Sequence, residues 1–499
     1  MRLKPDYPEA CLHLGHALKA LGRSADALAS YREAWRLNAD DAEIRSALIG
    51  QMQALCEWDG LETLMAAQRR DVGDSAALPI TPFSLLSIPS SAEEQYRCAT
   101  KFARAHFQPF AALRDKLAFK HQRVAKPKLR VGYLSADFHE HATAYLIAEL
   151  FELHEREHFE IIAYSYGRDD SGPMRTRLVA ACDRFVDIRE HSLADSASII
   201  YGDRIDILVD LKGYTRHARP EILALRAAPI QVHFLGYPGT LGTEFIDYLI
   251  ADHFVSPPAQ AQYFSEKLVY LPDCYQINDR RRDIADAAPS RLSFGLPEQG
   301  MVFCCLSSPY KITPEMFDIW MRLLLAAPGS VLWLLQGDGL QMENLVREAG
   351  RRSVAANRLV FAPKLPNAEH LARYRYADLF LDTFPVNAHT TASDALWAGL
   401  PLLTCSGDTF VSRVAGSLLH GVGLPQLTVS DLGAYETLAL RLAQQEVELR
   451  DLRQHLERNR LTCPLFDSRR FTAHLERAYQ TMWQRYLAAA PPDALDIVQ

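Results

Sequence analysis

A histidine and two threonines stand where an apolar run gives way to a helical pattern. In the segment DLFLDTFPVNAHTTASDALWAG (378–399), the apolar run predicts a strand, and a helix is expected to start at the threonines. The start of a helix has free N–H groups and a partial positive charge, which suit a phosphate. His389, Thr390 and Thr391 add further donors there. Thr391 with Asp394 also fits a capping box, so a well-capped structural helix is the alternative.

Two more predicted strand ends carry single candidate side chains. Lys311 follows an apolar run and precedes a helix that starts at a proline, where an ammonium group could neutralise a diphosphate. A solvated surface lysine explains this position equally well. His370 ends the turn FAPKLPNAEH (361–370), which could hold a base or a ribose, although a single histidine is more often structural.

Histidines also follow the first apolar run in the middle of the chain. His139 and His141 lie beside Asp137 in SADFHEHATAYL (135–146). Residue 143 is a threonine, so H-E-x-x-H is not formed, and acid–base or substrate-contact chemistry is favoured over a metal site. Surface histidines are the alternative. The sequence has no G-x-G-x-x-G, Walker P-loop, G-x-S-x-G or Asp-x-Asp motif, so no metal-bridged diphosphate site of that type is expected.

Short apolar runs must supply the strands that position these side chains. They alternate with amphipathic segments in two blocks, which predicts two parallel sheets with helices on both faces. Ligands of such sheets bind beyond the carboxyl ends of the strands, so the cleft between the two lobes is the expected site. The expected strands are 129–136, 159–166, 206–211, 230–237 and 245–252 in the first lobe, and 302–308, 330–336, 358–363, 379–384 and 401–407 in the second.

The beginning of the chain fits the tetratricopeptide template. Gly15 and Ala27 are expected where two helices touch closely, with Leu14, Leu18 and Tyr31 filling the seam between them. A second, divergent unit follows. Because about three repeats are normally needed to bury their faces, either this segment packs on the next domain or further repeats precede it. A plain helical hairpin is the alternative.

Composition and length set the broad class. The chain has 499 residues, of which 48% are apolar and 23% charged, with a net charge of −7. This predicts a cytoplasmic globular protein of about three domains that contacts neither nucleic acid nor membrane, with its nine cysteines reduced. We expect repeat helices over 1–75, a helical connector over 76–127, a first lobe over 128–276, a linker over 277–294 and a second lobe with a closing helix over 295–499.

Taken together, these motifs resemble the protein O-GlcNAc transferase family, glycosyltransferase family 41. The resemblance covers nearly the whole chain, and the short linker between the lobes resembles that of bacterial members. It implies an α/β fold with an all-α N-terminal region: tetratricopeptide helices followed by two facing Rossmann-like lobes of the GT-B type. The motifs are RVGYLSADFHEH (130–141), APIQVHFLGYPGT (228–240), YKI (310–312), VLWLL (331–335), the segment 378–399, SRVAGSLL (412–419) and PLFDSRRFTAHLERAYQTMWQRY (464–486).

The resemblance implies an inverting transferase that moves N-acetylglucosamine from UDP-GlcNAc to Ser/Thr hydroxyls of proteins presented by the repeats. No metal ion or other cofactor is implied. Lys311 matches the lysine that holds the diphosphate. His389, Thr390 and Thr391 match the His-Thr-Thr that grips phosphates and sugar. His141 matches the active-site histidine once favoured as general base.

Further residues follow from the same resemblance. Asp394 matches the aspartate near the ribose, and His370 the histidine against the uracil. Leu365 and Ser308 are also expected around the nucleotide sugar. A glycine turn is expected on the acceptor and sugar side. Its residues are Gly236, Tyr237, Pro238, Gly239 and Thr240.

Two departures from the family leave the donor open. The Asn/Gln-rich stretch before Tyr-Lys is Ser307-Ser308-Pro309 here, and Asn367 stands where animal members usually have a lysine. One alternative is a transferase that uses another nucleotide sugar, such as GDP-fucose, associated with the plant-type branch, or UDP-glucose. Others are a UDP-GlcNAc 2-epimerase and a repeat scaffold that binds nucleotide with weak turnover.

Overall fold

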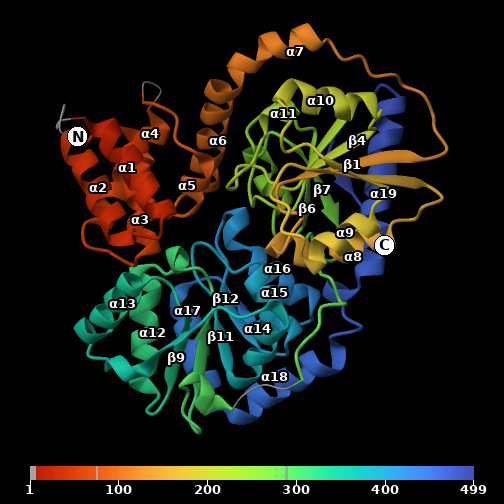
Figure 1. The fold of residues 1–499 in the computed structure, drawn as a ribbon. Helices are drawn as coiled ribbons and strands as arrows, with labels where there is room; N and C mark the ends of the chain where they lie inside the picture. The colour runs from red at the N-terminus through yellow and green to blue at the C-terminus, as the bar shows by residue number, and fades with distance from the viewer. Residues whose placement is uncertain (1–6, 75–76, 287–289, 499) are drawn as a thin grey trace.

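The computed structural model describes residues 7–74, 77–286 and 290–498. Figure 1 shows a helical N-terminal region beside two lobes, each built around a sheet. No helix among these residues is long and apolar enough to cross a membrane.

Two helix pairs form the N-terminal region. A Cβ atom on Gly15 would lie 2.4 Å from Cε1 of Tyr31, so only glycine permits this close packing. Leu18 and Tyr31 are buried as predicted, whereas Leu14 is 38% exposed and does not fill the seam. The pairs are α1 (Pro8–Ala20) with α2 (Ser24–Leu37), and α3 (Ala42–Ala54) with α4 (Leu61–Gly73).

These helices pack on the second lobe. Asn344 Nδ2 donates to the carbonyl of Leu55 at 2.9 Å, and the rings of Trp58 and Phe317 lie 5.3 Å apart. The short repeat array therefore buries its face on a neighbouring domain, which is one of the two expectations. The connector then runs along the first lobe (Figure 1). Its helices are α5 (Pro82–Leu86), α6 (Ala92–Phe107) and α7 (Ala111–Leu117).

The first lobe holds an eight-stranded parallel sheet. Its strands are β1 (Leu129–Ser135), β2 (Phe159–Ser165), β3 (Arg184–Asp187), β4 (Ile207–Asp210), β5 (Ile230–His233), β6 (Tyr248–Asp252), β7 (Lys267–Leu271) and β14 (Leu495–Asp496). The order β14-β7-β6-β5-β4-β1-β2-β3 reverses its direction between β1 and β4, which makes that position the switch point. The helices of this lobe are α8 (Ala142–Leu153), α9 (Pro173–Ala181), α10 (Leu193–Gly202) and α11 (Glu221–Ala224).

The second lobe repeats this plan with six parallel strands. They are β8 (Val302–Cys305), β9 (Val331–Leu335), β10 (Leu359–Ala362), β11 (Leu379–Leu381), β12 (Leu402–Cys405) and β13 (Thr428–Val429). In the order β10-β9-β8-β11-β12-β13 the switch point lies between β8 and β11. The helices are α12 (Pro314–Ala326), α13 (Gly339–Arg351), α14 (Asn367–Arg373), α15 (Thr390–Trp397), α16 (Val414–Gly421), α17 (Leu432–Gln444) and α18 (Glu446–Asn459).

The last helix, α19 (Ser468–Leu487), returns to the first lobe. Leu475, Tyr479 and Met482 are buried in the core of the first sheet, and β14 pairs with β7. The predicted second lobe, residues 295–499, includes this helix, so its placement there is wrong. The spacing of its apolar residues predicts a helix with one buried face, but it does not say which sheet that face covers.

Candidate active site

Lys311 and the loop before α15 meet at the switch point of the second sheet. Lys311 ends a short 3₁₀ turn, Pro309–Lys311, that follows β8. Its Nζ donates to the carbonyl of Asn387, 2.6 Å away in the loop after β11. Burial lowers the pKa of Lys311 to about 8, although the charge of Asp382 acts in the opposite direction. The ammonium group is therefore mostly charged at neutral pH.

Asp382 shapes the loop that leads into α15. Its Oδ1 accepts from the backbone N–H groups of Thr383, at 2.8 Å, and Ala388, at 2.7 Å. Its Oδ2 accepts from the hydroxyl of Thr404 at 2.6 Å. One buried carboxylate thus ties both ends of the loop to the neighbouring strand and fixes the direction in which α15 starts.

Helix α15 starts at Thr390, as the sequence predicts, and Thr391 is its second residue. The residue before the helix is His389, whose side chain makes no capping hydrogen bond. The predicted capping box between Thr391 and Asp394 is therefore wrong. The box does not form because the buried Asp394 carboxylate accepts a hydrogen bond from the guanidinium group of Arg282 instead.

The buried polar atoms around this helix that have no hydrogen-bond partner within the described residues include Arg282 Nη2, Asn387 Oδ1 and His389 Nε2. Buried polar groups are nearly always paired, so unpaired atoms gathered beside a helix start are candidates for binding a polar ligand. Burial lowers the pKa of His389 well below its usual value, which keeps the ring neutral. Of the other predicted residues, Ser308 is exposed and Leu365 is half-buried.

His370 lies on α14 and faces α15. Its Nδ1 accepts an N–H from Arg373 at 2.5 Å, so the hydrogen-bond network assigns the ring proton to Nε2. That Nε2 lies 3.8 Å from Asp394 Oδ2. Burial, with the charges of Arg373 and Arg282, lowers the pKa of His370 to about 3. The ring is neutral, and Asp394 lies between it and Arg282.

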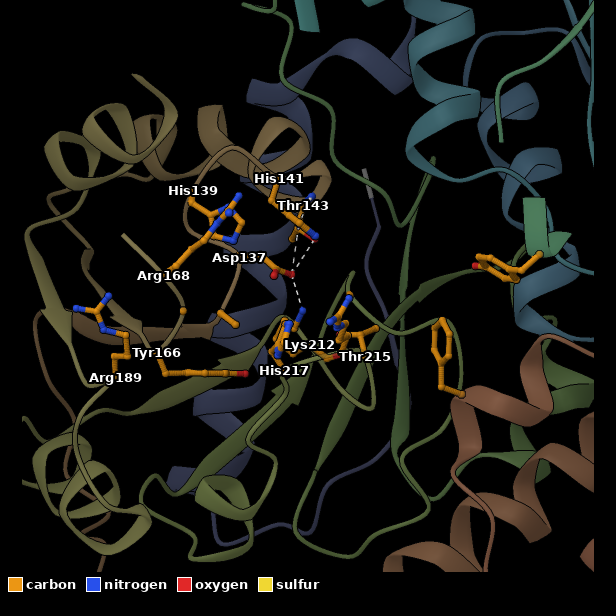
Figure 2. Close-up of a pocket in the computed structure, with 16 residues that line it drawn as sticks. Asp137, His139, His141, Thr143, Tyr166, Arg168, Arg189, Lys212, Thr215 and His217 are labelled. Carbon is orange, nitrogen blue, oxygen red and sulfur yellow. Dashed lines mark hydrogen bonds and ion pairs between the residues drawn. The ribbon is translucent and has the colours of Figure 1, made fainter. Parts of the chain in front are cut away.

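In the first lobe, Asp137, His141 and Lys212 meet at the other switch point (Figure 2). Asp137 and His141 follow β1, and Lys212 follows β4. Lys212 Nζ lies 2.7 Å from Asp137 Oδ2. His141 precedes α8, and its Nδ1 accepts from the N–H of Thr143 at 3.2 Å and lies 3.4 Å from the same Asp137 oxygen. Burial lowers the pKa of His141, and Asp137 and Lys212 act on it in opposite directions.

A cavity of about 830 Å³ opens beside these residues (Figure 2). Loops after β1, β2 and β4 form most of its wall. Tyr310 of the second lobe and Phe83 of α5 also line it. Because Tyr310 is the residue before Lys311, the cavity adjoins the site at α15. We call it the first-lobe cavity.

The sequence of this chain matches the profile described as "Glycosyl transferase family 41" over residues 56–288 and 285–475. The chain belongs to glycosyl transferase family 41. The predicted family is therefore confirmed. The two facing sheets with helices in front confirm the predicted fold class as well.

Relatives of this family 41 chain include a probable UDP-N-acetylglucosamine–peptide N-acetylglucosaminyltransferase SEC of Arabidopsis thaliana. It is 35% identical over 91% of the chain and 48% of the relative. A Caenorhabditis elegans UDP-N-acetylglucosamine–peptide N-acetylglucosaminyltransferase is 27% identical over 88% of the chain and 49% of its own length. The chain thus spans about half the length of these relatives.

A solved structure, a mutant of the Thermobaculum terrenum O-GlcNAc transferase, has a similar fold. It superposes with a TM-score of 0.81 at 29% identity, covering 98% of this chain and 93% of that one. Its match extends over the repeat helices as well as both lobes of the family 41 chain.

The glycine turn of this family 41 chain reaches the cavity only in part. Gly236 lines the first-lobe cavity, and a Cβ there would lie 1.9 Å from the carbonyl oxygen of Leu211. The other predicted residues of the turn are buried behind it, and the hydroxyl of Thr240 donates to Glu266 at 2.7 Å. These buried residues are Tyr237, Pro238, Gly239 and Thr240.

Two functional candidates were not predicted from the sequence. Arg282 lies in the charged run of the linker, where its sequence surroundings indicate only a solvated segment. Lys212 follows the strand 206–211, and its position at a strand end was the one available signal. Among the described residues, no group of three or more His, Cys, Asp or Glu side chains is placed to hold a metal ion.

Proposed function

We propose that the chain transfers N-acetylglucosamine from UDP-GlcNAc to serine or threonine hydroxyls of proteins. The observation that carries this proposal is the set of polar groups around α15: the Lys311 ammonium and the unpartnered atoms of Arg282 and His389. They surround a helix start at a switch point, where a diphosphate is expected to bind. The names of the relatives support the sugar and the protein acceptor.

The proposed reaction is a single displacement with inversion. The acceptor oxygen forms a bond to the anomeric carbon while the bond from that carbon to the β-phosphate oxygen breaks. Negative charge then grows on the leaving diphosphate. Lys311 and the N–H groups at the start of α15 stabilise it, as fixed donors in a buried site do most effectively. In this proposal, no step requires a metal ion.

The acceptor proton has two candidate destinations, His141 and a diphosphate oxygen. His141 Nδ1 already accepts from Thr143, so the network assigns the ring proton to Nε2. In this tautomer Nε2 donates a hydrogen bond and cannot take a proton. We therefore assign His141 the role of orienting the acceptor or sugar, with the proton passing to a diphosphate oxygen.

The first-lobe cavity is the proposed entrance for the acceptor. It lies beside His141 and Gly236, and Phe83 of the connector helix α5 forms part of its wall. A protein held by the repeat helices would reach it from that side.

Calorimetric titration with UDP and GDP, followed by a transfer assay with UDP-GlcNAc and mass spectrometry of the acceptor, tests the proposal. We expect UDP to bind, GDP to bind much more weakly, and Lys311→Ala to weaken UDP binding and abolish transfer. Preference for GDP would indicate a different donor. Tight UDP binding with no transfer to any acceptor would indicate a nucleotide-binding scaffold.

A further inference from the structure

The first-lobe cavity is basic, although the chain as a whole has a net charge of −7. Among its lining residues are four Lys or Arg side chains, three histidines and one carboxylate. The carboxylate, Asp137, is already paired with Lys212. Three further cations line the cavity: Arg168, Arg189 and Arg216.

These arginines come from three separate loops and have exposed side chains. Arg168 follows β2, Arg189 follows β3 and Arg216 follows β4. Arg189 lies 3.3 Å from Glu190 and 3.8 Å from Asp187, two carboxylates that are themselves exposed. Within the part of the chain that the structure describes, no ion pair holds Arg168 or Arg216. Their charge is therefore available to a ligand.

One cation of the repeat helices, Lys19 on α1, lies near the arginines of the cavity. Burial and the charge of Arg216 both lower the pKa of Lys19 on α1, so these two cations act on one another. Phe83 and Tyr310, whose rings lie 6.5 Å apart, form an aromatic edge on the cavity. An extended chain that enters past these rings would meet the positive charge of the first lobe and of Lys19.

We propose that the first-lobe cavity recognises aspartate and glutamate side chains of the acceptor, close to the serine or threonine that is modified. The identity of the reaction rests on the proposed function, whereas the charge preference is a property of binding. A guanidinium group binds a carboxylate by charge-assisted hydrogen bonds, and a field of one sign concentrates ligands of the other.

The spacing of the arginines favours a peptide over a small anion. Donors for one phosphate converge on a single point, whereas Figure 2 shows Arg168 and Arg189 on different parts of the wall. The cavity, at about 830 Å³, is also larger than a single anion requires. Several carboxylates along one extended chain match this arrangement.

Two peptides test this proposal by calorimetry with the full chain and UDP. One has a central serine flanked by glutamates, and the other has glutamines in their place. We expect the glutamate peptide to bind about tenfold more tightly at low salt, and the difference to shrink as salt screens it. The variant Arg168→Gln with Arg189→Gln and Arg216→Gln should lose this difference.

A matched control changes the net charge equally at a distant place. It carries three substitutions of exposed arginines on α17 and α18 of the second lobe and should keep the preference. These are Arg441→Gln, Arg450→Gln and Arg458→Gln. Equal affinity for both peptides, or an equal loss in the control, would overturn the proposal. So would a single-stranded RNA that binds the cavity more tightly than the glutamate peptide.

Transfer measurements separate this proposal from the proposed function. If both peptides receive N-acetylglucosamine and bind with equal affinity, the proposed function stands and the charge preference is wrong. If the glutamate peptide binds preferentially but neither peptide receives a sugar from UDP-GlcNAc, the charge preference stands and the proposed function is wrong.

Discussion

Lys212 Nζ lies 2.7 Å from Asp137 Oδ2, and both side chains are more than nine-tenths buried. This ion pair joins the loop after β4 to the loop after β1 across the switch point of the first sheet. The same Asp137 oxygen lies 3.4 Å from His141 Nδ1. Lys212 therefore limits how far the carboxylate can raise the pKa of the histidine.

Replacing Lys212 by methionine should raise the pKa of His141 and destabilise the protein. The buried Asp137 loses its partner, and breaking a buried ion pair costs about 3–5 kcal/mol. Its charge then acts on His141 without the opposing charge of Lys212. Denaturant unfolding measures the first effect, and NMR titration of the histidines measures the second. Lys126→Met, which breaks the ion pair with Asp206, should leave the pKa of His141 unchanged. An unchanged pKa in Lys212→Met would contradict the coupling.

UDP affinity should fall as the pH rises through about 8, because that is the pKa of Lys311 in the free protein. Below this pH the ammonium group is charged and stabilises the diphosphate. At pH 9 only about a tenth of the lysine is protonated, so we expect up to about a tenfold loss of affinity between pH 7 and 9. Calorimetry at these pH values measures it. Lys311→Met should bind weakly at both, and a wild type with constant affinity would exclude this lysine as the titrating group.

Arg282 should have two separable roles. Arg282→Gln removes the charge that partners the buried Asp394 and should lower stability by about 3–5 kcal/mol. Arg282→Lys keeps a cation for Asp394 but loses the planar group whose Nη2 has no partner in the described protein. We expect the lysine variant to unfold near the wild-type temperature and to bind UDP more weakly. Unchanged UDP binding in that variant would limit Arg282 to the ion pair.

The strands that the sequence predicts have continuous apolar runs, although the prediction misses β7 (Lys267–Leu271), whose run is equally apolar. Cys304 and Cys305, for example, are buried in β8, which has helices on both sides of its sheet. Edge strand β3 (Arg184–Asp187) has no such run, since its side chains are partly or fully exposed and need not be apolar. Strand β13 is only two residues long, which is too short to give a pattern. These strands form because a neighbour offers hydrogen bonds, and that neighbour is distant in the sequence.

In the candidate site, too, local sequence patterns predict some features, whereas contacts between distant residues determine the others. Lys311, His389 and Thr390 stand at strand ends or a helix start, which local patterns predict. The ion pair between Arg282 and Asp394 joins residues 112 positions apart, and no local pattern predicts it. The capping-box prediction at Thr391 failed for that reason, since a distant arginine holds the carboxylate that the local motif requires.

Gly15 offers a test of the repeat packing. Alanine normally stabilises a helix by about 1 kcal/mol relative to glycine. At Gly15 its Cβ would lie 2.4 Å from the Tyr31 ring, so Gly15→Ala should instead destabilise the protein by about 1–3 kcal/mol. Gly50→Ala on α3 is the matched control, because no atom lies within 4 Å of its Cβ, and it should be neutral or stabilising. Denaturant unfolding of both variants measures the difference, and equal effects would argue against close packing.

Variants of His141 distinguish the two candidate destinations of the acceptor proton. A general base contributes about 10²–10⁴-fold to the rate, and glutamine cannot take its place in that role. If His141 only donates a hydrogen bond from Nε2, His141→Gln keeps a donor and should retain turnover within about tenfold. His141→Ala should lower kcat further while leaving UDP affinity nearly unchanged, because the residue lies in the first lobe, whereas Lys311 and α15 lie in the second. Initial rates and UDP titrations of both variants measure this. If glutamine and alanine abolish turnover equally, the proton goes to His141 and our assignment of the tautomer is wrong for the reacting complex.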